Sequence, residues 1–69
     1  MSKENILRQA MGRSKLNQKD LAEHTGMTEP TMSKKLKNPN LITLLELERM
    51  NTVLKFTDYE MKTLIGGNG

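Results

Sequence analysis

Residues 18–36 constrain the fold more than any other part of the chain. They show the spacing of two short amphipathic helices, with Gly26 between them where the chain must turn sharply. Such a corner needs a left-handed backbone, which would cost another residue about 1–2 kcal/mol. Ala22 is small enough for the crossing point of the two helices, and Met32 can pack the second helix onto the first. The segment predicts two helices packed across a tight corner, and an ordinary helical corner is the alternative interpretation.

Helix-start signals recur along the chain and predict five short helices. A Ser, Thr or Asn side chain at the start of each segment can accept a hydrogen bond from the first helical turn. At residues 43–46 and 57–60, a Glu three positions after the Thr completes a capping box. Gly12 and the Asn-Pro-Asn run at residues 38–40 are expected to end helices. The predicted helices cover residues 2–12, 17–25, 28–37, 43–54 and 57–65.

No strand pattern competes with these helices, so the predicted fold class is all-α. We expect one compact five-helix domain over residues 1–66 and a disordered tail at residues 67–69. Apolar residues recur at helical spacing in every segment, which predicts one shared core. The expected core residues are Ile6, Leu7, Ala10, Leu21, Ala22, Met27, Met32, Leu36, Leu44, Leu47, Met50, Val53, Leu54, Met61, Leu64 and Ile65.

Length and composition argue against several classes of function. A chain of 69 residues buries only roughly 60% of its unfolded surface, so self-association is expected from size alone. The absence of cysteine excludes disulfides and thiolate metal sites, and His24 alone cannot build a usual zinc site. Without a nucleophile–base pair or a phosphate loop, we expect no enzyme activity, cofactor or small-molecule substrate. No apolar run could span a membrane and no secretory leader is present, so a cytoplasmic protein is expected.

The positive charge is concentrated in the first part of the chain. The formal net charge is +3 and the sequence pI is about 9.5, which is mild for a nucleic-acid binder. Residues 1–39 contain eight Lys and Arg against four Asp and Glu, an excess of +4. The remaining residues contain three basic and four acidic side chains, an excess of −1. The first part is therefore suited to a polyanion and the second is not.

The outward side of the third predicted helix carries groups that can contact DNA. Met32 and Leu36 share its buried face, so Lys34 points directly away from the core. A lysine there suits guanine O6 and N7, as when a helix-turn-helix presents its second helix to the major groove. For Glu29, favourable placement at the positive end of the helix is the simpler interpretation. The candidates for base contacts are Glu29, Pro30, Thr31, Ser33, Lys34 and Lys37.

A second group of residues is suited to the DNA backbone. Gln18 opens the second predicted helix, where its side chain and the free backbone N–H groups can grip one phosphate. Lysines and the polar loop after the third helix are further candidates, for which a solvated surface is the alternative interpretation. The candidates for phosphate contacts are Gln18, Lys19, Thr28, Lys35, Asn38 and Asn40.

The motif resembles the Cro/CI-type (XRE-like) helix-turn-helix family of phage and bacterial transcription regulators. The resemblance covers about residues 3–65, and residues 32–38 are especially similar to small prophage-type regulators. It implies a lambda-repressor-like bundle of five helices, in which helices two and three read DNA and dimers bind palindromic operators. It rests on Gln18, Leu21, Ala22, Gly26, Thr28, Met32 and Ser33. It implies a phosphate anchor at Gln18 and groove-facing positions at Thr28, Glu29, Pro30, Ser33 and Lys34.

Two residues depart from the family pattern. Lys35 stands where the family often has a bulky apolar residue, and Leu36 follows it. Thr25 stands before the corner glycine, where the family usually has an aliphatic residue. Both departures suggest a somewhat shifted packing of the third helix.

These observations predict a sequence-specific regulator of transcription, a Cro-like repressor that binds an operator in double-stranded DNA as a homodimer. The dimer surface is expected on the fourth and fifth helices, where Phe56 and Tyr59 are the available exposed aromatics. The alternative is an antitoxin-like or adaptor module that uses the same fold to bind protein. An adaptor would expose apolar residues on the third helix, and lysines stand there instead.

Overall fold

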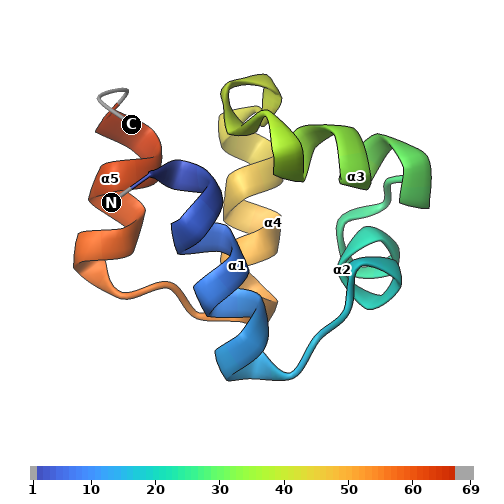
Figure 1. Cartoon of the computed structure of the whole chain (residues 1–69), viewed down its shortest axis with the longest axis horizontal. Coiled ribbons are helices and arrows are strands. Elements are labelled where there is room, and N and C mark those ends of the chain that lie inside the picture. The colour runs from blue at the N-terminus through green and yellow to red at the C-terminus, as the bar shows by residue number, and fades with distance from the viewer. Residues whose placement is uncertain (1, 67–69) are drawn as a thin grey trace.

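The computed structural model describes residues 2–66, which form five α-helices and one short 3-10 helix. The central pair, α1 (Lys3–Ser14) and α4 (Leu44–Leu54), is flanked on one side by α5 (Asp58–Gly66) (Figure 1). On the other side lie α2 (Gln18–Thr25) and α3 (Glu29–Lys37), and η1 (Pro39–Leu41) leads from α3 to α4. No strand occurs within residues 2–66, which confirms the all-α prediction. The tail predicted at residues 67–69 lies outside the described residues.

Side-chain caps begin the helices as predicted. The Ser2 hydroxyl accepts a hydrogen bond from the Asn5 N–H at 3.2 Å. In the boxes at residues 43–46 and 57–60, the Thr hydroxyl accepts the Glu N–H at 3.1 Å. In both boxes the Glu carboxylate accepts the Thr N–H at 2.9 Å. Asn17, expected as a simple cap, forms a third box with Asp20. These local bonds satisfy N–H groups that the first helical turn leaves free.

The prediction that the first helix ends at Gly12 is wrong. The helix continues to Ser14, and Lys15 caps it with a left-handed backbone, φ 57°. The N–H of Lys15 donates to the Gly12 carbonyl, and the N–H of Leu16 donates to the Met11 carbonyl at 3.1 Å. Leu16 also packs against the core, and this contact accompanies the closing bonds of many helix ends. Tertiary packing therefore carries the helix past the glycine, which a helix interior tolerates at a cost of about 1 kcal/mol.

The core lies between α1, α2, α3 and α4 and is closed at one end by α5. The prediction that Leu44 and Ile65 are buried in the core is wrong, because Leu44 is 59% exposed and Ile65 is 54% exposed. Leu44 stands one turn before the buried Leu47, and Ile65 stands in the last turn of α5. Both continue an apolar stripe beyond the point where another helix covers it. The expectation that Phe56 is exposed is also wrong, because its ring is half-buried against the core.

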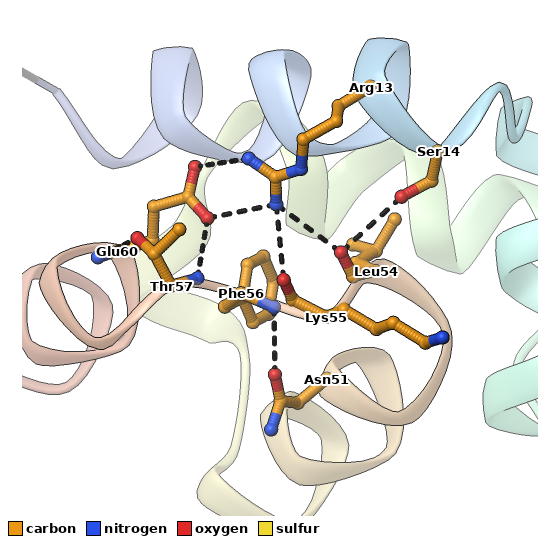
Figure 2. Close-up of polar contacts among 8 residues, drawn as sticks. All are labelled: Arg13, Ser14, Asn51, Leu54, Lys55, Phe56, Thr57 and Glu60. Carbon is orange, nitrogen blue, oxygen red and sulfur yellow. Dashed lines mark hydrogen bonds and ion pairs between the residues drawn. The ribbon is translucent and has the colours of Figure 1, made fainter.

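A polar network joins α1 to α5 and to the end of α4 (Figure 2). The Arg13 guanidinium donates to both carboxylate oxygens of Glu60 at 3.0 Å, and the Glu60 side chain is only 7% exposed. Arg13 also donates to the carbonyls of Leu54 and Lys55 at 3.3 Å. The hydrogen bond from Arg13, together with the Thr57 N–H, holds the pKa of Glu60 below its usual value. One arginine therefore links α1 both to the start of α5 and to the end of α4.

Candidate nucleic-acid interface

The corner between α2 and α3 has the geometry that the sequence predicts. Gly26 has φ 72°, in the left-handed region, and the Met27 N–H closes the turn on the Ala22 carbonyl at 2.9 Å. An added Cβ at Gly26 would meet only the Arg49 side chain, at an ordinary 3.9 Å. The glycine is therefore required by the backbone conformation and not by lack of space.

Residues from α2, α3 and α4 hold this corner together. Met32 is completely buried and fixes α3 against the core. Arg49 of α4 donates to the Thr25 carbonyl at 3.5 Å. Its positive charge is stabilised there by the negative, C-terminal end of the α2 dipole. Thr25 itself is buried, and its hydroxyl lies 2.8 Å from the Leu21 carbonyl, to which it donates. A threonine therefore occupies the place of an aliphatic residue here without an unpaired hydroxyl.

The structure exposes most of the predicted base-contact residues on one side of α3. Lys34 and Lys37 are exposed, and Ser33 is half-buried beside them. At the start of the helix, the Thr28 hydroxyl accepts the Thr31 N–H at 3.4 Å and donates to the Thr31 hydroxyl at 2.9 Å. Both threonines are exposed, as are the neighbouring Glu29 and Pro30.

A surface hollow lies between α1, the start of α2 and the end of α3. It is lined by three of the predicted residues, Gln18, Ser33 and Lys37, and also by Arg8 of α1. Arg8 carries an exposed guanidinium that lies 3.4 Å from the Glu4 carboxylate one turn earlier. Sequence reasoning missed Arg8, because α1 had no predicted position relative to α2 and α3. Its position opposite the buried stripe of α1 is the only sequence signal that could have marked it.

Two predicted phosphate contacts have partners within the protein. Lys35 lies beside α4, where its ammonium forms an ion pair with Glu46, and both side chains are largely buried. This contact holds the pKa of Glu46 below its usual value. Asn40 accepts a hydrogen bond from the Lys3 ammonium at 3.3 Å and lines a hollow with Leu44. The structure thus does not bring Lys35 and Asn40 together with Gln18, whereas Lys19 and Asn38 remain exposed.

The described residues contain no competing metal centre or membrane span. No group of three or more His, Asp or Glu side chains within residues 2–66 could hold a metal ion. Over the same residues, no helix is long and apolar enough to cross a bilayer.

Comparison with known proteins agrees with this geometry. The sequence model of the Cro/C1-type HTH DNA-binding domain matches residues 6–66, which run from the first turns of α1 to the end of α5. The match includes the corner at Gly26, all of α3 and all but one of the candidate caps. No match was found among curated proteins or among solved structures. The chain therefore belongs to the Cro/C1-type helix-turn-helix family of DNA-binding domains.

Proposed function

We propose that this protein is a Cro-like repressor that binds a palindromic operator as a homodimer and inserts α3 into the major groove. The exposed side of α3 is the observation that carries this proposal. Lys34 and Lys37 project from it, while Met32 anchors the opposite side in the core. A helix of nine residues reads only a few base pairs, so a useful affinity requires two copies on one operator.

The residues of this surface divide into two roles. Lys34 is best placed for a guanine edge, and Pro30 offers apolar contact to a thymine methyl group. Arg8 joins the backbone-contacting group because it shares the hollow with Gln18. The base contacts that we propose are from Glu29, Pro30, Thr31, Ser33, Lys34 and Lys37. The phosphate contacts that we propose are from Arg8, Gln18, Lys19, Thr28, Asn38 and Asn40. We leave out Lys35 because its ammonium pairs with Glu46 and both side chains are largely buried, whereas the internal partners of Arg8, Thr28 and Asn40 are exposed contacts.

In vitro selection of DNA sequences, followed by gel-shift titration at several salt concentrations, tests the proposal. We expect a palindrome whose half-sites are centred one helical turn apart, roughly 10–10.5 base pairs. The affinity should fall steeply with salt, because each phosphate contact releases condensed counterions. A pool that never enriches, or an affinity that does not depend on salt, would instead favour the adaptor-like alternative.

Single-lysine variants separate the two roles. Lys34→Ala should lose about 1–3 kcal/mol of binding to the selected site and relax the preference at one base step. Lys19→Ala should weaken binding to all sequences alike and reduce the salt slope by about one. Lys55→Ala is the control, because Lys55 follows the end of α4 that lies away from α3 (Figure 1). If Lys55→Ala weakened binding as much as Lys34→Ala, the assignment of α3 would be wrong.

A further inference from the structure

We propose that Thr28 orients the hydroxyl of Thr31 so that Thr31 presents its proton to the edge of a base in the major groove. Thr28 is then a positioning residue, and Thr31 selects a base that can accept a hydrogen bond and disfavours cytosine. This inference rests on the proposed function, because it states what one of the proposed base contacts recognises.

The two hydroxyl groups form a pair at the start of α3. The Thr28 hydroxyl donates to the Thr31 hydroxyl at 2.9 Å and accepts the Thr31 N–H at 3.4 Å. Both side chains are exposed. Each hydroxyl has one proton and two lone pairs. Because the proton of Thr28 is used within the pair, the proton of Thr31 is the one that remains for a group outside the protein.

Other threonines inside helices use their protons differently. Those of α2, α4 and α5 donate to a carbonyl of their own helix, at 2.8, 2.6 and 2.9 Å for Thr25, Thr52 and Thr63. Thr31 stands in the first turn of α3, where the carbonyl four residues earlier lies outside the helix. Within residues 2–66 its hydroxyl accepts from Thr28 and donates to no protein group. The start of α3 therefore presents a hydroxyl proton that the threonines of the other helices do not.

The sequence at this cap also differs from the capping boxes of α4 and α5. In those boxes a Glu stands three residues after the capping Thr, and its carboxylate accepts the Thr N–H. At α3 the same position is Thr31, whose side chain is neutral. A carboxylate there would repel the phosphates of DNA, whereas a hydroxyl can donate to a base. The phosphate contact proposed for Thr28 then belongs to its backbone N–H, because its hydroxyl proton is already used.

The direction of the Thr28 hydrogen bond decides which bases suit Thr31. A threonine hydroxyl that rotates freely can pair with a donor or with an acceptor. In the major groove guanine, thymine and adenine each present an acceptor, whereas cytosine presents only its amino group. Opposite cytosine, the Thr31 proton would be left unpaired in a contact that excludes water, which is costly. The bond from Thr28 also polarises the Thr31 hydroxyl and makes it a stronger donor. We expect cytosine to be disfavoured by roughly tenfold at this step.

The test compares variants on the selected operator and on its single-base variants, by gel-shift titration at fixed salt. In Thr28→Asn the cap is kept, because asparagine caps a helix at least as well as threonine. The amide oxygen of the asparagine can accept the hydroxyl proton of Thr31 as well as its N–H, so Thr31 then presents lone pairs to the base. The preference at one base step should therefore shift toward cytosine by roughly tenfold, while the other steps stay as in the wild type.

Matched variants separate this role from a structural one. Thr28→Ser keeps the hydroxyl and should keep the wild-type preference. Thr31→Val removes the hydroxyl and should abolish the discrimination against cytosine at the same step. Thr28→Asn combined with Thr31→Val should match Thr31→Val alone, because Thr28 acts only through Thr31. Thr52→Val is the control, since the proton of this exposed hydroxyl is already bound within α4, and it should change no preference.

The failure of this inference is distinguishable from the failure of the proposed function. If the wild type selects an operator and Thr28→Asn keeps every base preference, the inference is wrong and the function stands. The inference is equally wrong if Thr28→Asn weakens binding to all sequences alike, or if the step that depends on Thr31 selects cytosine in the wild type. If the wild type enriches no sequence, the proposed function fails and this inference fails with it.

Discussion

The capping boxes that begin α4 and α5 share one sequence signature but differ in the tertiary contacts attached to them. In each box a Glu carboxylate accepts the N–H of the Thr three residues earlier at 2.9 Å. Glu46 also receives the single ammonium of Lys35 from α3, whereas Glu60 receives two guanidinium nitrogens of Arg13 from α1. A planar guanidinium fixes direction as well as distance, and an ammonium is a point charge. The α5 box is therefore tied to α1 by two parallel hydrogen bonds, while the α4 box is tied to α3 by one.

The largest expected effect is a loss of stability when Glu60 or Glu46 is replaced by alanine. Glu60→Ala should lower the free energy of unfolding by about 3 kcal/mol, because it removes half of a capping box and a largely buried, bidentate ion pair. Glu46→Ala should cost about 1.5 kcal/mol, since it loses the same capping bond but only one lysine contact. Urea denaturation of the two variants and the wild type measures the difference.

The third box, at α2, provides the control for this comparison. Asp20 accepts the Asn17 N–H at 3.4 Å and forms no ion pair within residues 2–66. Asp20→Ala should therefore show the cost of a capping carboxylate alone, about 0.5–1 kcal/mol. Equal losses in Asp20→Ala and Glu60→Ala would mean that the Arg13 contact adds no stability.

Glutamine substitutions isolate the ion pairs from the caps. Glutamine can still accept the Thr N–H in a capping box through its one amide oxygen. Glu60→Gln and Glu46→Gln therefore keep the cap and remove the charge together with the second acceptor oxygen, to which Arg13 or Lys35 donates. We expect a loss of about 1.5–2 kcal/mol for Glu60→Gln and about 0.5–1 kcal/mol for Glu46→Gln. Thermal unfolding monitored by circular dichroism gives both values. The comparison would be reversed if Glu46→Gln were the more destabilising of the two.

Lowering the pH should remove the contributions of Glu60 and Glu46 to the stability of the fold. The pKa of Glu60 is lowered by the hydrogen bond from Arg13, and the pKa of Glu46 is lowered by the hydrogen bond from Lys35. Because the folded-state pKa lies below the unfolded value of roughly 4.3, each group stabilises the fold above that pH. The contribution is lost as the pH falls from about 5 through the lowered pKa. Stability measured from pH 7 to pH 3 should therefore fall less in Glu60→Gln than in the wild type. An identical pH profile would contradict the assignment.

The features that sequence predicts well here are those decided within one helical turn. A cap depends on a side chain and an N–H three residues apart, and the left-handed corner depends on Gly26 alone. The outward direction of Lys34 follows from the helix period once Met32 is known to be inside. Local patterns of this kind therefore predict most of the fold and the exposed side of α3.

The errors arise where a neighbouring helix decides the outcome. Leu44 and Ile65 have the spacing of core residues, but no helix within residues 2–66 covers them and both are more than half exposed. Arg8 reaches the hollow beside Gln18 only because α1 packs against α3. The phosphate contact of Lys35 stays a prediction, but its ion pair with Glu46 on the next helix could not be predicted from the helical period of α3. Helical period gives the direction of a side chain but not the residue that meets it there.

The smallest expected effect is that of Lys35→Met, which tests whether Lys35 stabilises the fold or contacts DNA. Lys35→Met exchanges a largely buried ion pair for an apolar side chain at the edge of the core, and it leaves the Glu46 cap in place. Because the Glu46 carboxylate loses its ammonium partner but is partly exposed and still accepts the Thr43 N–H, stability should fall by no more than about 1 kcal/mol. Affinity for DNA should fall much less than in Lys19→Ala, since the Lys35 charge is already neutralised by Glu46. Urea denaturation and gel-shift titration at fixed salt measure the two quantities on the same protein. A loss of affinity equal to that of Lys19→Ala, with stability unchanged, would return Lys35 to the phosphate-contacting group and show that the ion pair opens on DNA.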